Sequence, residues 1–208
     1  MFFLGYQLAF SEIFIFGIIS FILRNFTNLL KIDAIVYYWS MFTILTGIWE
    51  LYFVANYSHV ITLAHNLLDS KNHVWTQPYN ISYLQPSLFS QIFYSEYGAY
   101  ADREYMDKMD NWSRVIESSH SLLCGFFCLV AIGNYLYKNL PEYWLSLSIA
   151  MGSQLMNSIL YLANYFNQIH QPYSVNYNNI SFPSGKYLEK RPFMYINIFW
   201  TIMPIYII

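Results

Sequence analysis

The sequence predicts an all-α integral membrane protein, a five-helix transmembrane bundle with a long aromatic-rich loop between the second and third helices. Hydrophobic residues make up 56% of the 208 residues and charged residues only 11%, whereas a soluble domain carries about 25% charged residues. Five windows are apolar over the roughly 20 residues that a helix needs to cross the hydrocarbon core. Polar segments separate these windows, which predicts that each forms its own helix.

The windows define the expected spans in chain order. These spans lie near residues 5–23, 35–57, 115–137, 143–166 and 194–208. A polar turn at 24–33 separates the first two, and a turn at 138–142 that contains Pro141 separates the third from the fourth. A segment rich in Asn, Ser, Pro and Gly, 168–191, precedes the last span. We therefore treat 1–208 as a single transmembrane domain.

The stretch 58–112 differs from the rest of the chain. It is too polar to span a bilayer and too rich in Trp, Tyr and Phe to be a disordered linker. We expect this interfacial loop to fold back onto one face of the membrane. A charged run from Asp102 to Asp110 ends it, and such a run is either a solvated face or, just before a span, an interfacial lid.

Charge gives a weak orientation and excludes one class of partner. Arg24, Lys31 and Lys138 lie in the short first and third connections, so the positive-inside tendency places that side in the cytosol or matrix. The formal net charge is -2, and the scattered basic residues form no patch for a phosphate backbone, so no nucleic-acid partner is expected.

Abundant Tyr, Phe, Ile and Asn are typical of an A+T-rich coding genome. This bias favours the mitochondrial inner membrane, with the endoplasmic reticulum as the alternative.

Cysteine and histidine spacing indicates no metal site and no disulfide framework. Cys124 and Cys128 are four residues apart in an apolar run and lie on one helix face. The five His residues are dispersed along the chain, so no zinc-type ligand spacing is present. We interpret the two cysteines as small core residues and expect no metal and no cofactor.

Two ionisable residues inside the expected spans are the main functional signal. An ionisable side chain in a transmembrane helix costs roughly 2.5–3.5 kcal/mol on insertion scales, so it needs a partner, a wet cavity or a function. In the second span, Glu50 shares a helical stripe with Thr46. In the third span, Glu117 and His120 are three residues apart, which places a carboxylate beside an imidazole on one helix face.

The fourth and fifth spans each carry a polar stripe as well. The residues concerned are Ser153, Asn157, Tyr161 and Asn164 in the fourth span and Asn197, Trp200 and Pro204 in the fifth. If the four stripes converge, they line a central pocket. The alternative is that they are interhelical hydrogen bonds, each worth about 0.6 kcal/mol on average. We favour the bonding role for the Ser and Asn residues and the pocket role for the two glutamates.

The chain resembles the emopamil-binding-protein family of EXPERA-domain membrane proteins, which includes a sterol isomerase. The resemblance runs from about Trp39 to Pro204 and is clearest from Ser95 to Tyr105, where the sequence looks like the family's Tyr-Ala and Asp-x-Arg-Tyr. The segment ending in Glu117 is similar to its Met-Glu-Thr. The ending with Asn197, Trp200 and Pro204 looks like its Asn-x-x-Trp-x-x-x-Pro.

This resemblance implies a five-helix fold and a set of pocket residues. It places Glu50, Glu117, Asn197 and Trp200 in the pocket, with Asp102 at its mouth. In the isomerase an acid protonates a ring double bond, a Trp face and carboxylates shelter the cation, and a neighbouring carbon loses a proton. Glu50, Glu117 and His120 would be the catalytic groups of such an enzyme, and Trp200, Asn197, Thr46, Asp102 and Tyr161 would contact its ligand.

Departures from the family pattern affect the proton relay. Thr46 stands where the family has a His one turn before the second-span Glu, and His120 stands where it has a Thr. The fourth span reads Met156–Ser158 in place of Tyr-Gly-Asp. The exchange is either reciprocal, with His120 as the proton shuttle, or drift in a chain released from catalysis.

Three functions follow from these patterns. The first is a non-catalytic accessory or structural subunit of a larger membrane complex of the respiratory chain, with membrane lipids and other subunits as partners. The second is a sterol 8-ene to 7-ene isomerase that uses Glu117, Glu50 and Trp200. The third is a protein that binds a sterol-like ligand or amphiphile without turnover.

Overall fold

The fold was analysed in a computed structural model of the whole chain, which describes residues 2–101, 111–169 and 193–208. It places the side chains of these residues except 111–114, 117, 118, 164–169, 193 and 194. The predicted all-α class is confirmed at this level, because the described chain is mostly helical. Within the described residues the only strands are two three-residue ones, β1 (Phe2–Leu4) and β2 (Pro78–Asn80), which pair antiparallel.

Five long helices lie close to the five windows read from the sequence. They are α1 (Gly5–Asn25), α2 (Ala34–Ala55), α6 (Asn111–Leu136), α7 (Leu140–Ile169) and α8 (Phe193–Ile207). Asp33 starts α2, because its side chain accepts hydrogen bonds from the backbone N–H groups of Ile35 and Val36. Pro141 lies in the first turn of α7, where a missing N–H costs nothing.

Three stretches of the described chain are helical, long and apolar enough to cross a membrane. They are Gly5–Asn25, Ser119–Leu136 and Leu140–Ala163, so the chain is a membrane protein with these candidate spans. Helix α2 has 22 residues, but its Trp, Tyr, Thr and Glu residues lower its hydropathy. Helix α8 is apolar and has only 15 residues. The structure therefore supports a membrane bundle without establishing five spans.

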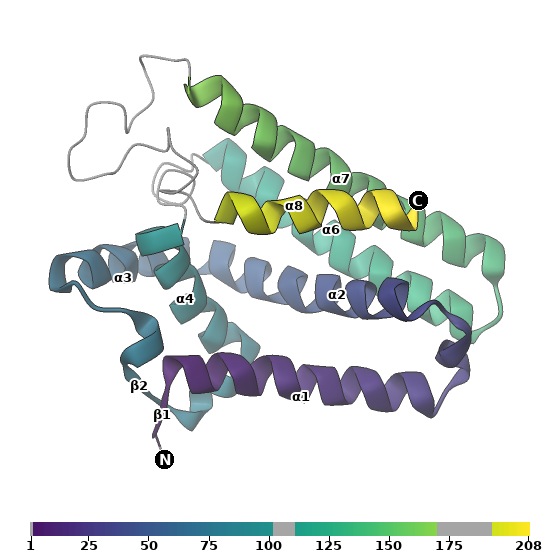
Figure 1. Cartoon of the computed structure of the whole chain (residues 1–208), viewed down its shortest axis with the longest axis horizontal. Helices are drawn as coiled ribbons and strands as arrows, with labels where there is room; N and C mark the ends of the chain where they lie inside the picture. The colour runs from purple at the N-terminus through teal and green to yellow at the C-terminus, as the bar shows by residue number, and fades with distance from the viewer. Residues whose placement is uncertain (1, 102–110, 170–192) are drawn as a thin grey trace.

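The segment expected as one long loop is instead largely helical up to residue 101, which corrects the sequence reading. It contains α3 (Tyr57–Ser70), α4 (Pro86–Glu96), two 3-10 turns (Val74–Thr76 and Ile81–Leu84) and a π-helical turn at 97–101. Helices α3 and α4 gather at one end of the bundle, beside the start of α1 and the end of α2 (Figure 1). The charged run 102–110 lies outside the described residues.

Core packing divides the described bundle into two main parts. Tyr37, Cys128 and Met151 belong to a buried cluster at the end where α1 joins α2 and α6 joins α7. Leu8, Trp49 and Phe89 belong to a second cluster between α1, α2 and α4. Both cysteines are free and buried, as expected for small core residues.

Candidate functional site

A cavity of about 300 Å³ lies within the bundle at the end nearer α3 and α4. Six helices line it, α1, α2, α4, α6, α7 and α8. Its polar lining residues are Thr43, Thr46, Glu50, His120, Ser121, Gln154, Asn157, Ser158 and Asn197. Its remaining walls, including those from α1 and α4, are mainly aromatic and aliphatic.

Glu50 reaches this cavity from the last third of α2, where α2 and α6 approach closely. Its carboxylate accepts a hydrogen bond from the Ser121 hydroxyl of α6. The close approach depends on glycine, because a Cβ at Gly47 would lie 2.9 Å from the Ser121 carbonyl oxygen. Gly125 of α6 faces the same crossing, because a Cβ at Gly125 would lie 3.7 Å from the Cα of Gly47. Small residues at such a crossing allow two membrane helices to approach.

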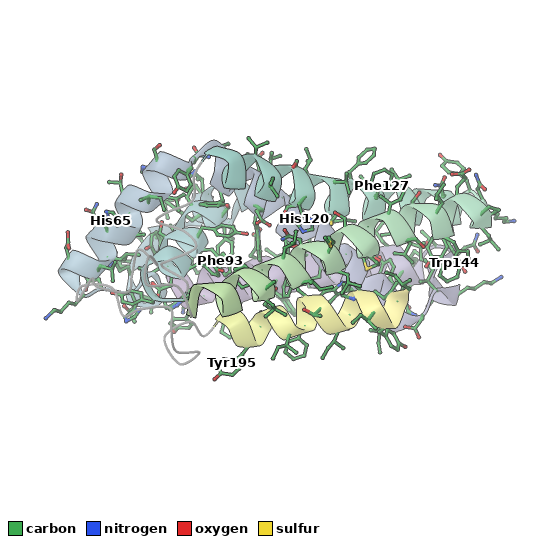
Figure 2. The ribbon with its side chains drawn as sticks, turned by 90° about the horizontal axis from the view of Figure 1, so that it is seen from above. His65, Phe93, His120, Phe127, Trp144 and Tyr195 are labelled. Atoms are coloured by element: carbon green, nitrogen blue, oxygen red, sulfur yellow. The ribbon has the colours of Figure 1, made fainter. Side chains whose placement is uncertain are left out.

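His120 lies on the α6 side of the cavity, within the bundle rather than on its outside (Figure 2). Its Nδ1 atom is 3.2 Å from the Ser153 hydroxyl of α7. Cys124, one turn further along α6, places its sulfur 3.6 Å from the same Nδ1 atom. The imidazole therefore joins a polar cluster between α6 and α7.

Asn197 is the most informative residue of the cavity. It comes from α8, its side chain is 6% exposed, and its amide Nδ2 has no hydrogen-bond partner among the described residues. A buried amide donor without an acceptor costs about 1–3 kcal/mol. Such a group in the wall of a cavity is what a ligand oxygen would satisfy.

Trp200 stands one turn after Asn197 and is held by aromatic neighbours. Its ring lies edge-on to Trp39 and to Phe42, with centroids 5.2 Å and 5.6 Å apart. Trp39 in turn donates from Nε1 to Gln154 Oε1 at 2.8 Å. This arrangement fixes one aromatic wall of the cavity against α2 and α7.

The structure brings six of the predicted site residues to one cavity. They are Glu50, Thr46, His120, Tyr161, Asn197 and Trp200. Asp102 lies outside the described residues, and so does the side chain of Glu117, although its backbone belongs to α6. The convergence of the stripes is therefore visible on α2, α6, α7 and α8, while the chemical roles stay predictions.

Sequence reasoning missed Glu12, a buried carboxylate of α1. Its side chain is 5% exposed, and its Oε1 accepts a hydrogen bond from Trp49 Nε1 at 3.3 Å. Trp49 lines the cavity, so Glu12 lies immediately behind its wall. The rule applied to Glu50, that an acid within a span needs a reason, also applies to Glu12.

The aromatic wall contributed by α4 was also missed. Its cavity-lining residues are Phe89, Phe93 and Tyr94, followed by Tyr97 of the π-helical turn. These residues pack on Trp49 and Phe53 of α2, for example with the Tyr94 and Phe53 rings stacked at 4.6 Å. Phe89, Phe93 and Tyr97 are spaced at i, i+4 and i+8 in the sequence, which is a signal for one helix face. The sequence does not show which helix this face packs on.

A buried carboxylate fastens this wall to the chain that precedes it. Glu96, at the end of α4, accepts from the Val74 backbone N–H at 2.9 Å and lies 2.7 Å from His73 Nδ1. Nearby, burial and the neighbouring Tyr83 and Glu96 raise the pKa of Tyr79 to about 12. The Tyr79 phenol therefore stays neutral at any physiological pH.

Within the part of the chain that the structure describes, no group of three or more His, Cys, Asp and Glu side chains is arranged to hold a metal ion. Cys124 instead contacts the Ala150 carbonyl oxygen at 3.4 Å. The site is therefore an apolar cavity with a polar end. The chain matches no known protein-family model, and no curated protein or solved structure shows significant similarity to it.

Proposed function

We propose that this protein binds an amphipathic membrane lipid of sterol type in the cavity, without converting it. The observation that carries the proposal is the buried Asn197 amide, which lines the cavity without an acceptor among the described residues. A hydroxyl or carbonyl oxygen of the ligand accepts from this amide. The apolar part of the ligand then lies against Trp49, Phe89 and Phe93.

Size and polarity support a small-molecule ligand. The cavity volume of about 300 Å³ falls at the lower limit of the roughly 300–1,000 Å³ range of ligand pockets. A predominantly apolar wall with a few placed polar groups is also what such pockets have in common. The resemblance to the emopamil-binding-protein family is an independent reason to name a sterol-like molecule.

The proposal includes five membrane crossings. Helix α2 lies between α1 and α6 (Figure 1), and both of these helices contain candidate spans. Its polar residues Thr43, Thr46 and Glu50 face the cavity rather than lipid, so its moderate hydropathy is compatible with crossing. Helix α8 packs along α7, and it crosses with its 15 residues if the bilayer thins locally.

Binding to a fluorescent sterol tests this function. The purified chain in lipid nanodiscs is titrated with dehydroergosterol, and energy transfer from tryptophan to the sterol is measured. We expect saturable transfer that excess unlabelled sterol competes away. Transfer that rises linearly with sterol content, as for a bystander in the same bilayer, would contradict the proposal.

An isomerase is the second candidate, favoured by the placement of Glu50 and His120 in one cavity with Trp200. Incubation with an 8-ene sterol and analysis of the product by mass spectrometry and chromatography distinguishes the two. Under the binding proposal the sterol is recovered unchanged. Conversion to the 7-ene isomer that disappears in Glu50→Gln would establish the enzyme instead.

A role as an accessory subunit of a respiratory-chain complex is compatible with ligand binding. The observation that favours it is the outer face of α1, where Phe10, Phe14 and Phe21 are exposed at helical spacing. A partner helix could pack there in place of lipid. Affinity purification from the native membrane tests this role, and loss of stoichiometric partners in a triple Phe→Leu variant is the expected result.

A further inference from the structure

Two residues of the cavity wall are also exposed on the outside of the bundle. Ile13 of α1 is 52% exposed and Ile196 of α8 is 46% exposed. Every other lining residue is buried or half-buried. The described structure therefore opens the cavity between α1 and α8.

The position of these two residues along their helices sets the depth of the opening. Ile13 is eight residues after the start of α1 at Gly5, or about 12 Å along the helix axis. Ile196 is three residues after the start of α8 at Phe193, or about 5 Å. Both helices start at the end of the bundle that carries α3 and α4 (Figure 1). With the starts of both helices at the edge of the hydrocarbon core, the opening would lie within one leaflet, because half of that core is about 15 Å.

The surroundings of the opening are apolar. Phe10 lies one turn before Ile13 on α1, Phe199 lies one turn after Ile196 on α8, and both side chains are exposed. Side chains of this kind at this depth contact hydrocarbon rather than water. The polar groups of the cavity, including Asn197, lie further inside.

We propose that the cavity opens sideways into the bilayer through a lateral portal, defined by Ile13 and Ile196, and that the apolar chain of a membrane amphiphile occupies it. This inference rests on the proposed function in naming the amphiphile, but the portal can be tested separately. A lipid chain is the occupant because Ile13 and Ile196 at the rim, and the exposed Phe10 and Phe199 one turn away, are all apolar. The ligand reaches Asn197 from the lipid phase without crossing water.

Quenching of Trp49 by the lipid itself tests the portal. Trp49 is buried from the outside of the bundle and lines the cavity, so a bulk acyl chain approaches it only through the opening. The full chain is reconstituted in vesicles of phosphatidylcholine brominated on its acyl chains, which quench tryptophan by contact. Each variant is also made with Trp49→Phe. The quenching of Trp49 is the difference in fluorescence quenching between a variant with Trp49 and the same variant with Trp49→Phe.

The rim is then narrowed, with a matched control. Ile13→Phe with Ile196→Phe adds bulk at the portal, and Ile15→Phe with Ile198→Phe makes the same change on the same helices. Ile15 and Ile198 are 46% and 45% exposed and do not line the cavity. We expect brominated lipid to quench Trp49, the rim variant to lose at least half of that quenching, and the control to keep it.

Three results would overturn the portal. They are no quenching of Trp49 by brominated lipid in the parent chain, equal quenching in the rim variant and the control, and stronger quenching by aqueous iodide than by brominated lipid. The failure of the proposed function has a different signature. In that case Trp49 is quenched through the rim as described, but dehydroergosterol shows no saturable binding.

Discussion

At the residue scale, the polar side chains held inside the apolar bundle fall into two groups. Glu50 is bonded to Ser121 across a helix crossing, and Glu12 accepts from Trp49. In contrast, the Asn197 amide has no acceptor among the described residues. Satisfied groups stabilise the bundle, whereas an unsatisfied one costs stability. Replacing a satisfied polar residue should therefore lower the stability of the bundle, whereas replacing the unsatisfied Asn197 should raise it.

Glu12→Ala should destabilise the bundle. The substitution removes the acceptor of Trp49 Nε1, and a buried indole N–H without a partner costs about 1–3 kcal/mol. The free energy of unfolding in mixed detergent micelles measures the effect. Glu12→Gln is the matched control, since its amide oxygen still accepts this bond, and it should lie close to the parent chain. Equal losses in both variants would show that the bond is not the cause.

At the element scale, the positions of the long helices were predictable from the sequence and their packing was not. Five apolar windows led to helix positions within a few residues of α1, α2, α6, α7 and α8, because length and hydropathy are local properties. Glu50, which the sequence places on the polar stripe of α2, lines the cavity, and its chemical role stays a prediction. The α4 wall and the Glu12 bond could not be predicted in this way, because both are defined by contacts with Trp49 on another helix.

The crossing of α2 and α6 yields a prediction at this scale. A Cβ at Gly47 would lie 2.9 Å from the Ser121 carbonyl oxygen, so Gly47→Ala must push the helices apart and weaken the Glu50–Ser121 bond. We expect a loss of about 1–3 kcal/mol, as for other overpacked sites, seen as a lower unfolding temperature.

Gly133→Ala on α6 is the control for this crossing, because nothing lies within 4 Å of its Cβ position. Alanine favours a helix over glycine by up to about 1 kcal/mol, so this variant should equal or exceed the parent in stability. A Gly47→Ala variant as stable as Gly133→Ala would mean that the two helices are not in close contact.

At the scale of the whole molecule, the five membrane crossings that we propose would place the two ends of the bundle on opposite sides of the membrane. Lys31 and Lys138 lie in turns at one end, and His65 of α3 lies at the other. Single cysteines at these positions should react with an impermeant maleimide from opposite sides of sealed vesicles. The native Cys124 and Cys128 are buried and should contribute little signal. Labelling of all three positions from one side would contradict this topology.

The central claim is that Asn197 is kept for a ligand at the expense of stability, and paired measurements on Asn197→Leu test it most directly. Replacing the unpartnered amide with an apolar side chain should raise the free energy of unfolding by about 1 kcal/mol. The same change should weaken dehydroergosterol binding about tenfold, since a lost hydrogen bond of about 1.4 kcal/mol corresponds to that factor. Asn134→Leu is the control, because Asn134 donates to Ser146 at 3.4 Å and does not line the cavity. This variant should be less stable than the parent and should bind the sterol equally well. An Asn197→Leu variant that is less stable than the parent and binds the sterol equally well would contradict the account.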